Sequence, residues 1–312
     1  MQYQNLVRKA WQLTQEHHYL TRWGVLASIF TLLVGLIRVR YFFTDPAITL
    51  GTIWEYLNMN YEHPVRMIII IEIIWWSIYL LAFIIHNLSD GALIGAIAKI
   101  EDQKVRLSFS KSLSIGLNSF LRITEYNAVT SIFKVGNFII YIFLLRFWLL
   151  IYMDGWDFLA ENYIWLSALL IFLSFFTLLI TYGEYDLVIH KHGPFKAIRN
   201  SITLVTFHLG ETLLMMMLVL LISIRAIINI LLVFFIPAAV ASIIGYLTLH
   251  ISQLIAVGVG VTIGMIIFWF AVKIAGALHV FTTAVWTLTY MDLDSRQDHK
   301  ILANEKDDIE ED

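Results

Sequence analysis

Six charged side chains lie inside or at the ends of strongly apolar runs, and charges in such places are costly and therefore candidates for function. They are Arg38, Arg40, Glu72, Arg146, Arg225 and Lys273. The guanidinium group binds phosphate through paired hydrogen bonds, so the four arginines form a candidate site for an anion or a lipid headgroup. Glu72 and Lys273 form a candidate ion pair within the membrane. Structural ion pairing, or long side chains reaching from helix ends toward water, accounts for the same residues equally well, and the sequence leaves both interpretations open.

Histidine supplies the second set of candidates. His190, His192, His208 and Glu184 fall between the fourth and fifth apolar runs and are the closest approach to a metal-ligand set. The chain has no His-Glu-x-x-His motif, no Gly-x-Ser-x-Gly motif, no phosphate-binding Gly-Lys-Ser or Gly-Lys-Thr and no cysteine. We therefore predict no metal site, no cofactor and no catalytic residue.

The composition identifies the class of protein that must position these residues. Of 312 residues, 59% are hydrophobic and 14% charged, whereas a soluble protein is nearer half apolar and a quarter charged. A bilayer core needs about 20 apolar residues for each helix. Six runs meet this need: about 23–43, 65–85, 128–152, 163–182, 213–236 and a segment within 255–290. The sequence thus predicts an all-α polytopic membrane helix bundle with about six transmembrane helices.

Two segments beside these runs need separate interpretation. Residues 238–257 are read as a piece that does not span the membrane, with a seventh crossing as the alternative. The first run follows about twenty mostly polar residues and no small-residue cleavage pattern, so it is read as a retained helix rather than a cleavable signal peptide.

Lysine and arginine are distributed unevenly between the connections. They gather in the N-terminal arm, between the second and third runs, and between the fourth and fifth runs, whereas the alternate connections are acidic or neutral. Basic loops stay in the cytoplasm. The expected location is the cell membrane, with both termini cytoplasmic.

Short amphipathic basic segments precede the first, third and fifth runs. In residues 193–205, an apolar stripe of Phe195, Ile198, Ile202 and Val205 lies apart from the cations. Residues 108–123 and 6–20 have similar stripes, and each segment contains a lysine followed by a small and an apolar residue. Such helices lie in the membrane interface with their cations among lipid phosphates. The predicted interfacial cations are Lys9, Lys111, Arg122, Lys196 and Arg199.

The recurrence divides the chain into three units, each with an interfacial helix followed by a helical hairpin. The units cover about residues 5–100, 107–190 and 193–291 of one membrane domain, 1–291. The segment 292–312 is acidic and poor in apolar residues, so it is predicted to be a disordered cytoplasmic tail.

Four segments carry a resemblance to a known family. They are "VRKAWQLTQEHHYLTRWGVLAS", "DGALIGAIAKIEDQKVRLSFSKSL", "DLVIHKHGPFKAIRNSITLV" and "TTAVWTLTYMDL". They resemble the prokaryotic family related to the membrane domain of glycerophosphoryl diester phosphodiesterases, over about residues 7–293. The resemblance implies a six-helix integral membrane domain. Phosphodiesterase activity belongs to a separate soluble barrel for which this chain has no counterpart, so that activity is not carried over.

These observations lead to one preferred function and two alternatives. The preferred one is a non-enzymatic membrane protein that interacts with lipid or anions and organises the membrane or partner proteins. A secondary transporter of a small amphiphilic or anionic substrate would need a cavity near Glu72 and Lys273, and an intramembrane lipid-modifying enzyme would need His190, His192, His208 and Glu184 to converge. The expected partners are membrane lipids and a membrane protein or second copy of this chain, with no nucleic acid.

Overall fold

The computed structural model describes residues 3–43, 64–105, 107–133, 161–222, 224, 245 and 253–310. Every regular element in those ranges is a helix, which confirms the all-α prediction. In chain order they are α1 (Tyr3–Glu16), α2 (His18–Phe43), α4 (Pro64–Gln103), α5 (Phe109–Thr130), a 3-10 turn η1 (Ser131–Phe133), α8 (Tyr163–Leu179), α9 (Gly183–Ile189), α10 (Pro194–Phe207), a helix over Leu209–Ile222, and α12 (Gln253–Glu310).

Three helical segments are long and apolar enough to cross a membrane: Trp76–Gln103, Tyr163–Ile189 and Thr262–Gln297. A fourth crossing is possible if α10 and the helix Leu209–Ile222 count as one, although they meet at 97°. The predicted membrane class is therefore confirmed in its coarse form. The third predicted run lies mostly outside the described residues, as do most of 238–257 and the end of the fifth run, so six crossings stay a prediction.

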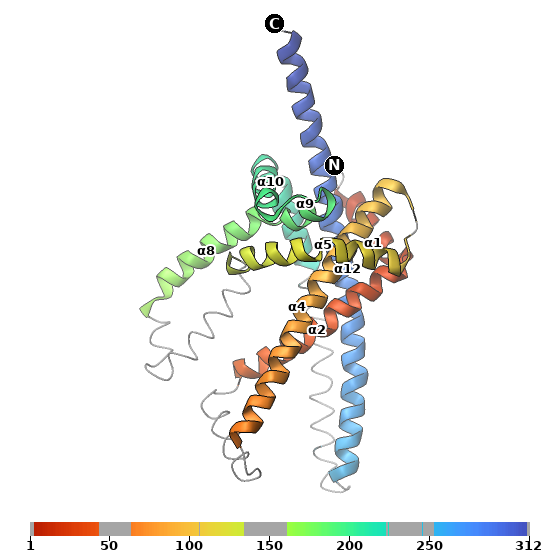
Figure 1. The fold of residues 1–312 in the computed structure, drawn as a ribbon, viewed down its shortest axis with the longest axis vertical. Helices are drawn as coiled ribbons and strands as arrows, with labels where there is room; N and C mark the ends of the chain where they lie inside the picture. The colour runs from red at the N-terminus through yellow and green to blue at the C-terminus, as the bar shows by residue number, and fades with distance from the viewer. Residues whose placement is uncertain are drawn as a thin grey trace.

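Several helices extend away from the centre of the molecule with their apolar side chains uncovered. The N-terminal halves of α4 and α12 extend in the same direction, and α8 extends to another side (Figure 1). We call residues 65–84 of α4, 163–175 of α8 and 259–274 of α12 the apolar legs. Their large side chains are exposed, as at Trp76, Leu80, Ile171 and Met265. An exposed apolar surface of this extent fits lipid rather than water.

The buried centre forms where α1, α2, α5, α9 and α10 meet the C-terminal half of α4 and residues 271–293 of α12. One cluster of buried side chains includes Leu20, Leu93, Ile97 and Val285. A second, which includes Ile123, Tyr182 and Leu187, lies between α5, α9, α10 and α12. Polar groups also tie the helices together here, because the Trp23 indole N–H donates to Ser112 Oγ at 2.8 Å.

The three amphipathic helices bury a face that repeats with the same spacing. The buried sets are Leu6, Ala10 and Leu13 in α1; Ser112, Gly116 and Ser119 in α5; and Ala197, Ser201 and Leu204 in α10. The lysines of the second and third helices, Lys111 and Lys196, directly precede the first buried residue of their sets. Lys9 instead precedes the second, so the register predicted from the lysines differs by one helical turn in α1.

The predicted apolar stripes of α5 and α10 are divided between the core and the surface. Leu113 and Ile198 pack against the buried clusters, and Val205 is fully buried. Leu117 is 59% exposed and Phe195 is 76% exposed, while the neighbouring small-residue face is buried. Small residues allow helices to approach closely, which explains why this face packs inward. Each of these two helices therefore packs its small residues and part of its apolar stripe against protein, and leaves other apolar side chains exposed beside its polar ones. A helix at a membrane surface needs such an arrangement when it also contacts protein.

The connections into α5 and α10 are built alike. Each preceding helix ends near a lysine with left-handed backbone, Lys104 with φ 53° and Lys191 with φ 58°. Extended N-cap residues follow, Ser108 before α5 and Gly193 before α10. The Ser108 hydroxyl accepts from the backbone N–H of Lys111, which satisfies one free donor of the first turn. Pro194 occupies the start of α10, where a missing N–H costs nothing.

At the C-terminus, α12 is a single helix that continues to Glu310 (Figure 1). This helix includes most of the acidic segment 292–312, and the predicted disorder of that segment stays a prediction. Extending an existing helix avoids the cost of nucleating a new one, so a polar segment can be helical when it continues an apolar helix.

Candidate functional site

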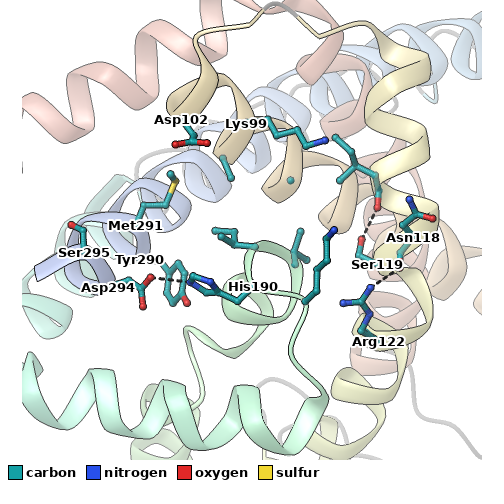
Figure 2. Close-up of a pocket in the computed structure, with 16 residues that line it drawn as sticks. Lys99, Asp102, Asn118, Ser119, Arg122, His190, Tyr290, Met291, Asp294 and Ser295 are labelled. Atoms are coloured by element: carbon teal, nitrogen blue, oxygen red, sulfur yellow. Dashed lines mark hydrogen bonds and ion pairs between the residues drawn. The ribbon is translucent and has the colours of Figure 1, made fainter. Parts of the chain in front are cut away.

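A cavity of about 470 Å³ lies between the C-terminal end of α4, the polar side of α5, the end of α9 and residues 290–295 of α12 (Figure 2). We call it the pocket. Four segments distant in the sequence meet here because the α4, α5 and α9 helices pack against one another and against α12. The charged and titratable residues that line it are Lys99, Asp102, Arg122, His190, Lys191 and Asp294.

The pocket carries more positive than negative charge. Three of its lining residues, Lys99, Arg122 and Lys191, are cationic, and two, Asp102 and Asp294, are acidic. Within the described part of the chain, none of the three cations forms an ion pair with a carboxylate. Asp294 is held by the His190 ring, whose Nε2 lies 2.9 Å from its carboxylate. The surplus of positive charge suits an anion.

The two walls of the pocket differ in chemistry. Lys99, Asn118, Ser119 and Arg122 lie on one side, and Asp102 and Asp294 lie on the other with His190 (Figure 2). The Arg122 guanidinium donates to the Asn118 backbone carbonyl at 3.4 Å, which holds it along α5. An anion would bind against the cationic wall, where ammonium, amide and guanidinium donors are grouped.

A buried carboxylate fixes the other side of the pocket. Asp186, which is 2% exposed, accepts hydrogen bonds from the Tyr290 hydroxyl at 3.0 Å and the Asn200 amide at 3.2 Å, and contacts His192 Nδ1 at 3.0 Å. Tyr290 also lines the pocket. These contacts join α9, α10 and α12, so the wall that holds His190 is rigid.

The three histidines of the predicted metal-ligand set each contact a different carboxylate. His190 contacts Asp294, His192 contacts Asp186, and His208 Nδ1 lies 3.5 Å from a Glu211 carboxylate oxygen. His190 and His192 stack at 5.6 Å between ring centroids. Among the described residues, these histidines and Glu184 do not form one group with converging ligand atoms.

The five predicted interfacial cations lie in three different environments. Arg122 lines the pocket. Lys9 forms an ion pair with Glu101 in the last turn of α4, so it links α1 to α4. The remaining three are exposed: Lys111, Lys196 and Arg199.

The predicted intramembrane charges are mostly outside what the structure describes. Arg146 and Arg225 lie outside the described residues. Arg38 and Arg40 lie in α2 and Glu72 lies in α4, and only their backbones are described. Lys273 is exposed on the α12 apolar leg, with Nζ 5.3 Å from the Trp269 ring centroid, a cation–π arrangement. The arginine site and the Glu72–Lys273 pair therefore stay predictions.

Sequence reasoning missed a second cluster, formed by His86, Asp90 and His279. Their ligand atoms lie within 4.8 Å of one another. His86 and Asp90 are one turn apart on α4, and that spacing was the available signal. His279 comes from α12, 189 residues after Asp90, so only the fold brings it to them.

No family model, no curated protein and no solved structure matches this chain.

Proposed function

We propose that this chain is a non-enzymatic integral membrane protein that binds the anionic headgroup of a phospholipid in the pocket and so organises lipid at the cytoplasmic face of the cell membrane. The observation that carries the proposal is the group of three cations, Lys99, Arg122 and Lys191, around one cavity with no carboxylate paired to them in the described part of the chain. Phosphate is the anion that a guanidinium and ammonium groups recognise best together.

The surface next to the pocket favours a lipid over a free anion. Leu117 and Leu121 lie on α5 beside Asn118 and Arg122, and they are 59% and 70% exposed. An acyl chain would cover these side chains while the phosphate lay against Arg122. The predicted orientation, with basic connections in the cytoplasm, puts the pocket on the inner side of the membrane.

The family resemblance stays a prediction, and the integral membrane domain that it implies agrees with this proposal. The transporter alternative needs a cavity near Glu72 and Lys273. The side chain of Glu72 lies outside the described residues, so no observation favours that alternative.

The proposal is tested by measuring lipid binding to the purified full chain with native mass spectrometry. The protein is reconstituted with phosphatidylglycerol or with zwitterionic phosphatidylcholine. The test variant is Arg122→Gln with Lys191→Gln. The control is Lys111→Gln with Lys196→Gln, which removes the same charge from exposed sites on α5 and α10.

A hydrogen bond to a charged group contributes about 1.5–3 kcal/mol. Losing the contacts of two cations with the phosphate should therefore weaken phosphatidylglycerol binding at least about 100-fold, since about 1.4 kcal/mol is tenfold. The control variant loses only general surface attraction, at most about 1 kcal/mol for each cation, so its binding should fall less. Equal losses in both variants would show general surface attraction and contradict the pocket. Inorganic phosphate is titrated separately, and displacement of the lipid at similar concentrations would identify a free anion as the ligand.

A further inference from the structure

We propose that His86, Asp90 and His279 bind Zn²⁺ or a similar divalent metal ion. The bound ion would link α4 to α12 at the end of the apolar legs that is nearer to the buried centre. None of the three residues lines the pocket. The inference is therefore independent of the proposed lipid function.

The three side chains converge on one point from two helices. His279 Nε2 lies 2.9 Å from one carboxylate oxygen of Asp90, and His86 Nε2 lies 3.4 Å from the other. A tetrahedral zinc site with ligand bonds of about 2.0–2.1 Å has ligand atoms about 3.3 Å apart. The two nitrogens face different oxygens of Asp90, and the ligand atoms of the three residues lie within 4.8 Å of one another. Rotation of the two rings toward one oxygen would bring them to that edge length around an ion.

The ligand types suit a borderline metal rather than calcium or magnesium. Two imidazole nitrogens and one carboxylate form a set used for zinc and for non-haem iron, whereas hard cations prefer oxygen ligands throughout. Three protein ligands leave a fourth position for water, as in zinc sites that are not fully closed by protein.

Burial at the site is graded in a way that permits loading. The Asp90 side chain is 11% exposed and that of His279 is 26% exposed, whereas that of His86 is 46% exposed. The ion would enter on the His86 side and be held against the buried carboxylate.

The simpler alternative is a hydrogen-bonded His279–Asp90 pair without metal. The position of His86 distinguishes a metal site from such a pair. A pair needs only one imidazole. Here a second histidine, one turn before Asp90 on α4, directs Nε2 to the same carboxylate, and the two rings lie 5.9 Å apart between centroids. Two imidazoles on one carboxylate are the arrangement expected of a ligand set.

The test measures Zn²⁺ binding to the full chain, purified in detergent without a polyhistidine tag and stripped with a chelator. The wild type should bind one equivalent. His86→Asn and His279→Asn should each weaken binding at least tenfold, and the control His18→Asn, an exposed histidine at the start of α2, should not. Zn²⁺ should also raise the thermal unfolding temperature of the wild type, because an ion that binds only the folded state stabilises it.

A second variant keeps the proposal falsifiable if His279→Asn fails to fold. The chain has no cysteine, so His86→Cys introduces a single thiol, and Co²⁺ bound at the site should give a sulfur-to-cobalt charge-transfer band. The proposal is overturned if the stripped wild type takes up no Zn²⁺. It is also overturned if both asparagine variants bind Zn²⁺ as the wild type does, or if Co²⁺ gives no such band with His86→Cys.

Discussion

Gly24 in α2 and Gly276 in α12 are in direct backbone contact. A methyl group on Gly24 would lie 2.2 Å from the Gly276 carbonyl oxygen, and one on Gly276 would lie 2.7 Å from the Val25 nitrogen. Only two glycines permit this approach. The contact joins the beginning of the chain to its last helix, and so closes the buried centre on which both candidate sites depend.

Replacing Gly24 with valine should therefore destabilise the protein. Overpacking of a closed contact typically costs about 1–3 kcal/mol, because backbone must move to relieve the clash. Gly264→Val is the control, since nothing lies within 4 Å of a methyl group there. Thermal unfolding in the same detergent compares the two, and an equal unfolding temperature for both variants would contradict the close crossing.

Tyr290→Phe should destabilise the wall of the pocket. The change removes the hydroxyl that donates to buried Asp186 at 3.0 Å. A hydrogen bond to a charged group is worth about 1.5–3 kcal/mol, so the free energy of unfolding should fall by that amount. Tyr163→Phe, at an exposed position on the α8 apolar leg, should change it by less than about 0.5 kcal/mol. A Tyr290→Phe variant as stable as the wild type would show that this bond does not hold α12 to α9.

Tyr126 makes the protein sensitive to alkaline pH. Burial, with a smaller contribution from Glu184, raises the pKa of Tyr126 well above its ordinary value of about 10. Its hydroxyl therefore stays protonated and donates to the Ile180 carbonyl. The stabilisation is fully present below about pH 10 and is lost above it, because the unfolded chain then releases a proton that the folded chain keeps.

The measurement is thermal stability of the wild type and Tyr126→Phe between pH 8 and about pH 11. The wild type should lose stability more steeply than the variant above about pH 10, by up to about 1.4 kcal/mol for each pH unit. Parallel curves for the two proteins would contradict this role for Tyr126.

Much of the helical framework could be predicted from hydrophobic runs, since a run of about 20 apolar residues has few other interpretations. The direction in which the amphipathic helices pack could not. The apolar stripes in α5 and α10 were predicted to face lipid, but Leu113 and Val205 of those stripes contact or enter the core. The buried side also contains Ser112, Gly116 and Ser201, whose small size carries little hydrophobic signal.

The pocket and the His86–Asp90–His279 cluster were harder to predict from the sequence than the helices. Arg122 was recognised as an interfacial cation, but its neighbours Lys99 and Lys191 come from α4 and the end of α9. His86 and Asp90 are spaced as helical neighbours, but His279 completes the cluster from α12. Contacts between distant segments depend on tertiary packing, which local periodicity does not contain.

The apolar legs should be shielded by lipid in intact membranes. The chain lacks cysteine, so single-cysteine variants can be labelled without background. Leu80→Cys and Ile171→Cys lie at exposed positions on the legs, and Ser110→Cys lies at an exposed position in the first turn of α5. A membrane-impermeant maleimide should label Ser110→Cys quickly in inside-out vesicles and the two leg variants slowly. Equal rates at all three positions would contradict the membrane location of the legs.

Binding of an anionic phospholipid headgroup in the pocket can be measured with a photoreactive benzophenone amino acid at Met291, which lines the pocket on α12. Illumination of membranes containing radiolabelled phospholipid should yield a covalent protein–lipid adduct. Arg122→Gln with Lys191→Gln should remove most of that adduct, whereas Lys111→Gln with Lys196→Gln should leave most of it. No adduct at Met291, or an adduct that the pocket variant does not reduce, would contradict headgroup binding in the pocket.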